Sequence, residues 1–216
     1  MRTYTTYVFD LDGTLTDTTE VWFGIYRDGL QHFGITPPEK KELAKHTHDW
    51  RQMLLLGLKE ENLEDFTHLA YKMARERLPK APVQEGAMEM LQQLQAKGKH
   101  IAIFSTLDRP IFEMAMQYRD LYQFAEVSIA GTDVPFRKPH PAGILKALED
   151  LEIGQEAFSD AVYLGDKDTD IQAAHNAGVN SILYFPPSHA EIYDFAKLKE
   201  EKPTYTISRW DELFAE

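Results

Sequence analysis

The chain has 216 residues, of which 43% are hydrophobic and 12% aromatic, which is enough apolar material for a substantial core. Its formal net charge of -12 repels nucleic-acid phosphates, so we expect no nucleic-acid partner. The absence of cysteine excludes disulfides, zinc–thiolate centres and cysteine nucleophiles.

The sequence shows no membrane or secretion signal. No apolar run approaches the roughly 20 residues that cross a bilayer, and residues 1–10 lack the basic and long apolar segments of a signal peptide. We therefore expect a cytoplasmic protein without a membrane partner, present as a monomer or a weak homodimer.

The first expected element is a short strand over residues 5–9, which ends in the sequence Asp10-Leu11-Asp12-Gly13-Thr14. The glycine and threonine break the strand into a turn, so we expect a functional loop at its end. The sequence Asp17-Thr18-Thr19-Glu20 has the spacing of a capping box and predicts a helix capped by Asp17.

The next stretch has only helical patterns. Pro37-Pro38-Glu39 indicates a helix start, and residues 50–58 and 60–78 have amphipathic helical spacing without a strand between them. We therefore predict an all-helical insert over residues 17–83, flanked by a core that is formed by residues 1–16 and 84–216.

After Pro82, apolar runs alternate with helical patterns. The runs lie at residues 100–105, 125–130, 161–164 and 181–185, and residues 204–207 form an expected edge strand before a capped terminal helix. This alternation is typical of a parallel sheet with helices on both faces. The predicted fold is therefore α/β, with a Rossmann-like core and an inserted helical unit.

Polar side chains follow several of these strands. They are Asp10 and Asp12, Ser105 and Thr106, Lys138 on a later loop, and Asp166 with Asp170. Ligands of open α/β sheets bind at the carboxyl ends of the strands, so these residues are expected to meet in one crevice. Each one alone fits a solvated turn, a helix cap or a surface charge, and only the ordered combination favours a functional site.

The chemistry of this set points to a divalent cation and to phosphoryl transfer. The carboxylates of Asp10, Asp12 and Asp166 are costly to keep ionised together unless a cation compensates, and Mg²⁺ suits such oxygen ligands. One shielded carboxylate can attack phosphorus while its neighbour acts as acid and base. Ser105 and Lys138 could hold the oxygens of the transferred group.

Four segments resemble the signature motifs of the haloacid dehalogenase superfamily of phosphohydrolases, in the order of that family. They are Phe9-Asp10-Leu11-Asp12-Gly13-Thr14-Leu15, Ile101-Ala102-Ile103-Phe104-Ser105-Thr106, Arg137-Lys138-Pro139-His140-Pro141 and Leu164-Gly165-Asp166-Lys167-Asp168-Thr169-Asp170. The helical insert is placed like the cap of the branch that is similar to phosphoglycolate phosphatase and β-phosphoglucomutase. The resemblance covers residues 5–185.

This resemblance implies a mechanism through an aspartyl phosphate, with Asp10 as the nucleophile and Asp12 as the acid and base. It implies that Mg²⁺ is held by Asp10, the backbone carbonyl of Asp12, and Asp166, with Asp170 in support. The implied phosphate-binding residues are Ser105, Thr106 and Lys138. Dehalogenases of the family lack the second aspartate, so Asp12 argues against dehalogenation.

Substrate specificity is expected to depend on the insert. Its most polar and aromatic segment, residues 46–51, offers His46, His48 and Arg51 as candidate substrate contacts, although a solvated helix junction is an equal alternative.

The leading hypothesis is a Mg²⁺-dependent phosphatase of a small phosphorylated metabolite. A phosphomutase similar to β-phosphoglucomutase is an alternative, because the motifs do not distinguish a phosphatase from a phosphomutase. A receiver-like phosphorylated regulatory module is a further alternative. However, such modules carry their acidic pair and their acceptor aspartate on different strands, whereas Asp10 and Asp12 share one.

Overall fold

The computed structural model describes residues 1–47 and 50–215. Six strands form one parallel sheet in the order β3-β2-β1-β4-β5-β6. They are β1 (Thr6–Phe9), β2 (His100–Phe104), β3 (Val127–Ile129), β4 (Ala161–Gly165), β5 (Asn180–Tyr184) and β6 (Tyr205–Ile207). Each strand begins and ends within two residues of a run predicted from the sequence. The predicted α/β class with a parallel sheet is confirmed.

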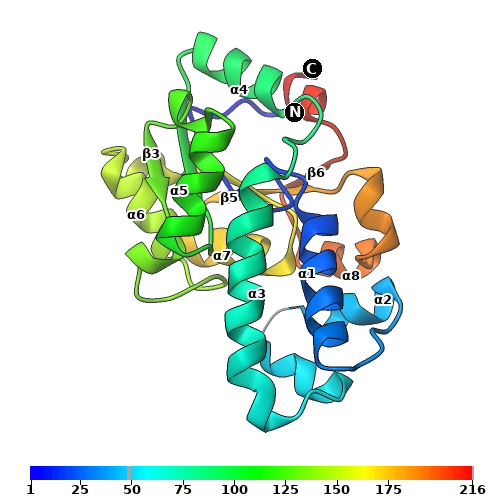
Figure 1. Cartoon of the computed structure of the whole chain (residues 1–216). Coiled ribbons are helices and arrows are strands. Elements are labelled where there is room, and N and C mark those ends of the chain that lie inside the picture. The colour runs from blue at the N-terminus through cyan, green and yellow to red at the C-terminus, as the bar shows by residue number, and fades with distance from the viewer. Residues whose placement is uncertain (48–49, 216) are drawn as a thin grey trace.

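Helices cover both faces of the sheet (Figure 1). On one face lie α4 (Ala87–Ala96) and α5 (Arg109–Tyr118), and on the other lie α6 (Ala142–Asp150), α7 (Asp168–Ala177) and α8 (Phe195–Glu200). Successive side chains of a strand point to opposite faces, so Tyr7 and Phe9 pack in the first layer and Val8 in the second. Burial on both sides explains why the strands are continuously apolar.

The residues between β1 and α4 are mainly helical. They form α1 (Thr19–His32), α2 (Lys40–Leu43) and α3 (Leu63–Arg77), with 3₁₀ turns at Ala44–His46, Trp50–Leu56, Glu60–Asn62 and Leu78–Lys80. In Figure 1, α1 and α3 run side by side and extend away from the sheet and from both termini. Over the ranges that the structure describes, no helix is long and apolar enough to cross a membrane.

Two local predictions are wrong. The segment from Trp50 is a 3₁₀ helix that ends at Leu56, and not an α-helix to residue 58. Asp17 does not cap α1, because Thr18 occupies the N-cap position without a side-chain hydrogen bond. Instead, the backbone N–H of Asp17 donates to the carbonyl of Pro82 at 2.8 Å.

This last bond belongs to a short pairing between the two connections that join the helical segment to the sheet. Thr16 and Val83 form an isolated antiparallel bridge beside it. The chain therefore leaves and re-enters the α/β core at one place, next to the loop that follows β1.

Candidate functional site

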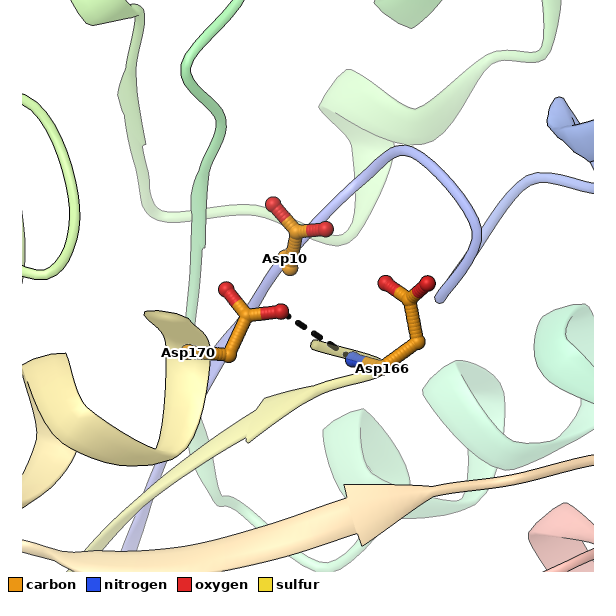
Figure 2. A group of neighbouring side chains, drawn as sticks. All are labelled: Asp10, Asp166 and Asp170. Carbon is orange, nitrogen blue, oxygen red and sulfur yellow. Dashed lines mark hydrogen bonds between the residues drawn. The ribbon is translucent and has the colours of Figure 1, made fainter. Parts of the chain in front are cut away.

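Three acidic side chains meet at the carboxyl ends of the central strands. Asp10 follows β1, Asp166 follows the neighbouring β4, and Asp170 lies in the first turn of α7. All three are buried, and each offers a carboxylate oxygen within 4.8 Å of the others. Figure 2 shows the three carboxylates converging from these separate elements. The convergence expected from the sequence is thus present in the fold.

Lys138 supplies a positive charge inside this cluster. Its Nζ lies 2.6 Å from Asp10 Oδ1 and 2.5 Å from Asp170 Oδ1, and it donates to the Tyr163 hydroxyl at 3.1 Å. The side chain is only 6% exposed. Burial alone would lower the pKa of Lys138, but the two carboxylates outweigh burial and raise it. The lysine therefore stays charged and offsets part of the acidic cluster.

Asp170 organises the loop after β4. Its Oδ2 accepts hydrogen bonds from the backbone N–H groups of Asp166 at 3.1 Å and Lys167 at 3.0 Å (Figure 2). Gly165 permits this approach, because a Cβ there would lie 2.3 Å from the Asp170 Cγ. These two hydrogen bonds fix the backbone position from which the Asp166 side chain projects.

Asp166 keeps one oxygen without a partner. Its Oδ1 accepts from the Thr14 hydroxyl at 3.1 Å, whereas Oδ2 is buried and has no hydrogen bond among the described residues. Gly13 has φ +84°, and a Cβ there would lie 2.5 Å from that Oδ2. Burial, with Asp170 adding, raises the pKa of Asp166 to about 6. A buried, unpartnered carboxylate oxygen is suited to a cation.

Asp10 and Asp12 both line a cavity beside the cluster. Burial raises the pKa of Asp10 to about 7, with Asp170 and Asp166 adding and Lys138 opposing. Burial and the Asp10 carboxylate likewise raise the pKa of Asp12 to about 6. The three clustered side chains all offer carboxylate oxygens, so the site fits a hard divalent cation such as Mg²⁺.

The expected phosphate-binding residues lie at the same edge of the sheet. Ser105 follows β2 and is buried, and its hydroxyl accepts the N–H of Leu107 at 3.2 Å. Thr106 and Lys138 line the cavity, and Ser105 is not among the lining residues.

The cavity has a volume of about 640 Å³ and lies between the strand ends and the helical segment. Thr47 and Trp50 line it, but the neighbouring His46 and Arg51 do not. His46 lies 3.6 Å from Glu42 instead. The third expected specificity residue, His48, lies outside the described residues.

Sequence reasoning missed two features of this cavity. Lys167 lines it, and the structure gives its ammonium no hydrogen bond or ion pair within residues 1–47 and 50–215. A lysine in an acidic turn has the pattern of a surface charge, so the sequence held no signal for this position. The aromatic side chains Trp22, Tyr26 and Tyr71 also line the cavity, although their helical spacing is typical of core packing.

Comparison with known proteins agrees with this geometry. The sequence is 27% identical over 212 residues to the pyrophosphatase PpaX of Bacillus mycoides, covering 96% of this chain and 94% of that protein. A predicted phosphoglycolate phosphatase from Haemophilus somnus is 18% identical with a TM-score of 0.81, covering 99% of this chain and 98% of that chain.

A Thermotoga maritima protein assigned as a β-phosphoglucomutase is 21% identical with a TM-score of 0.77, covering 97% of this chain and 96% of that one. The sequence model of the family described as haloacid dehalogenase-like hydrolase matches residues 7–184, a range that contains all four motifs. The chain therefore belongs to the haloacid dehalogenase-like hydrolase family, as its motifs indicated.

Proposed function

We propose that this hydrolase is a Mg²⁺-dependent phosphatase that transfers the phosphoryl group of a small metabolite to Asp10 and then hydrolyses the aspartyl phosphate. The observation that carries the proposal is the buried cluster of Asp10, Asp166, Asp170 and Lys138 beside a cavity of metabolite size. Two similar proteins are named as a pyrophosphatase and as a predicted phosphoglycolate phosphatase, and both names describe phosphate hydrolysis, which supports the proposal.

The residues that would hold Mg²⁺ are Asp10, the backbone carbonyl of Asp12, and Asp166, with Asp170 in support. The unpartnered Oδ2 of Asp166 supports this assignment, because a buried carboxylate oxygen otherwise lacks compensation. When bound, Mg²⁺ supplies positive charge that shields the carboxylates and the oxygens of the phosphate from one another.

The side chains of the site divide the reaction between them. An Asp10 carboxylate oxygen forms the bond to phosphorus while the bond to the leaving oxygen breaks. Asp12, whose pKa is raised to about 6, gives its proton to that oxygen. As a carboxylate it then takes a proton from the water that attacks the aspartyl phosphate. Lys138 and Thr106 bind the phosphoryl oxygens, and Ser105 orders the loop that presents Thr106.

In this proposal, residues 17–83 form a cap over the core of residues 1–16 and 84–216. The paired connections at Thr16 and Val83 support that division, because they join the two parts at one place. The cavity between the parts then holds the leaving group, and the cap excludes water during phosphoryl transfer.

The test is a screen of phosphorylated metabolites that includes β-glucose 1-phosphate and measures both released phosphate and isomerised sugar phosphate. We expect phosphate release that requires Mg²⁺, stops with a chelator and is lost in folded Asp10→Asn. Isomerisation without phosphate release would assign the protein as a phosphomutase. Turnover that is undiminished in metal-free protein would overturn the metal requirement.

A further inference from the structure

Four aromatic rings form one side of the cavity. Trp22 and Tyr26 lie on α1, Trp50 lies in the 3₁₀ segment and Tyr71 lies on α3, and all four line the cavity. The ring centre of Trp50 is 6.1 Å from Trp22, 5.0 Å from Tyr26 and 6.1 Å from Tyr71. These four residues, here called the aromatic wall, are therefore one contiguous surface built around Trp50.

The aromatic wall is only partly covered by protein. Trp22, Trp50 and Tyr71 are half-buried, whereas Phe66, whose ring lies 6.0 Å from Trp50, is fully buried beneath them. The rings therefore keep apolar surface in contact with the cavity, and a ligand that covers this surface gains hydrophobic and stacking free energy.

The two hydroxyl groups of the aromatic wall already have polar neighbours. The Tyr26 hydroxyl donates to the Thr47 carbonyl at 2.8 Å, and the Thr47 hydroxyl donates to another backbone carbonyl. Burial and the nearby Asp108 raise the pKa of the Tyr71 hydroxyl, with Arg137 opposing. A leaving group rich in hydroxyls would therefore gain few hydrogen bonds from the two tyrosines of the aromatic wall.

Size and chemistry also argue against inorganic pyrophosphate. The cavity volume of about 640 Å³ falls in the range of roughly 300–1,000 Å³ that is typical of sites for organic ligands. Pyrophosphate has no apolar surface with which to cover Trp22 or Trp50. We propose that the substrate is a phosphate monoester whose leaving group carries a planar aromatic or heteroaromatic ring that stacks on the aromatic wall. This inference rests on the proposed phosphatase function.

The test compares kcat/KM for benzyl phosphate, cyclohexylmethyl phosphate and glucose 6-phosphate, with pyrophosphate as a fourth substrate. The three esters share a primary-alcohol leaving oxygen, so their differences report binding of the attached group. We expect benzyl phosphate to exceed the cyclohexylmethyl ester by a factor on the order of five to ten, and glucose 6-phosphate by more. Equal or better turnover of glucose 6-phosphate or pyrophosphate would overturn the inference.

Substitutions in the aromatic wall then test whether it causes the preference for benzyl phosphate. Trp22→Leu and Trp50→Leu should raise KM for benzyl phosphate by about tenfold and remove its advantage over the cyclohexylmethyl ester, while Trp22→Phe should retain most of it. Tyr118→Leu is the matched control, because Tyr118 is 65% exposed and lies outside this cavity. Thermal unfolding shows whether each variant is folded.

Two further outcomes are distinguishable. If the folded leucine variants lose the same factor on every ester, the aromatic wall is structural and this inference is wrong. If no ester releases phosphate in the presence of Mg²⁺, the proposed phosphatase function itself is wrong.

Discussion

Asp10 and Asp12 are chemically identical and one residue apart, yet the proposed mechanism gives them different steps. Asp12→Ala keeps the phosphoryl acceptor but lacks the group that activates water. With an activated aryl phosphate, whose leaving group needs no proton, we expect one rapid turnover followed by a stall. Rapid mixing should show a stoichiometric burst of aryl alcohol and a base-labile phosphoryl label on the protein.

The matched control for this experiment is Asp10→Asn. Without the Asp10 carboxylate no acceptor exists, so neither a burst nor a label should appear. A folded Asp12→Ala protein without a burst, or a labelled Asp10→Asn protein, would contradict the division of labour.

Lys167 is the residue whose position adds most to the motif-based expectations. Lys167 lines the cavity, and none of the described residues gives its ammonium a hydrogen bond or an ion pair. Burial opposes the charge, but Tyr193 and the nearby carboxylates outweigh burial and raise the pKa of Lys167. We expect Lys167→Met to raise KM for a phosphate ester by a factor on the order of ten or more, with a smaller change in kcat.

Lys167→Arg tests whether charge is the cause, because it restores a cation at the same position and should recover most of the affinity. Lys146→Met, on α6 outside the cavity, controls for the loss of one positive charge. An unchanged KM in Lys167→Met would leave Lys167 only the role of balancing the charge of Asp166.

Some individual residues of the candidate site could be predicted from the sequence, and others could not. Asp10 could be predicted because it stands in a short motif directly after β1, and strand ends converge in an open α/β sheet. Lys138 lies on the loop before α6, and the order of the motifs made it predictable. Lys167, Trp22 and Tyr71 could not be predicted as cavity residues. Whether such a side chain faces a cavity or a neighbouring helix depends on how distant elements pack, which no local pattern encodes.

At the scale of elements, the strands were the most predictable part. The central strands β1, β2 and β4 are short apolar runs between turn residues and are buried on both faces, so their pattern is strong. The segment from Trp50 was less predictable, because a short amphipathic run fits a 3₁₀ helix as well as an α-helix. The role of Asp17 could not be predicted either, because its backbone N–H bonds to the carbonyl of Pro82, which lies 65 positions further along the sequence.

Arg119 joins α5 to the connection that leaves the helical segment. This buried guanidinium donates to the carbonyls of Leu78 at 2.6 Å, Ala81 at 2.7 Å and Ala115 at 2.8 Å. Arg119→Leu would leave these carbonyls without their donor. We expect the free energy of unfolding to fall by about 3 kcal/mol, measured by urea denaturation.

Arg75→Leu is the matched control for this variant. Arg75 is exposed on α3, and the substitution changes the net charge by the same amount without removing a buried donor. Equal destabilisation of the two variants would show that the effect arises from charge and not from the three hydrogen bonds.

At the scale of the whole molecule, stability should depend on the protonation of His189. Its ring is 0% exposed and packs against Tyr184 and Tyr193; Nε2 lies 3.5 Å from the Thr19 hydroxyl, and Nδ1 has no partner within the described chain. Burial, with the charge of Lys167 adding, lowers the pKa of His189 to about 4.

The sign of the pH effect follows from this depressed value. Between about pH 6.5 and pH 4 the unfolded chain binds a proton at this histidine that the folded chain excludes, so acid favours unfolding. We expect this one group to remove about 2–3 kcal/mol of stability on going from pH 7.5 to pH 4.5. His189→Leu should lose that part of the pH dependence in urea titrations. An unchanged pH dependence would contradict it.

The buried carboxylates have the opposite effect to His189, because they lower stability as pH rises. They should also make stability depend on Mg²⁺. The pKa values of Asp10, Asp12 and Asp166 are raised above the ordinary value of 3.8 to about 7, 6 and 6. As pH rises from 3.8 to about 7, the folded protein holds protons that the unfolded chain has lost. These three groups therefore progressively reduce the free energy of unfolding as pH rises. At pH 8 all three carboxylates are ionised, and a divalent cation should relieve their repulsion.

Mg²⁺ should therefore raise the Tm of the protein, and by more at pH 8 than at pH 5.5, where protons compete for the same oxygens. A saturating concentration should give a shift on the order of 5 °C or more at pH 8, measured by calorimetry against sodium chloride of equal ionic strength. Asp166→Asn should abolish the shift, whereas Asp211→Asn, at an exposed carboxylate far from the cluster in sequence, should retain it. A shift of equal size at both pH values, or one that survives in Asp166→Asn, would place the bound cation elsewhere on this acidic protein.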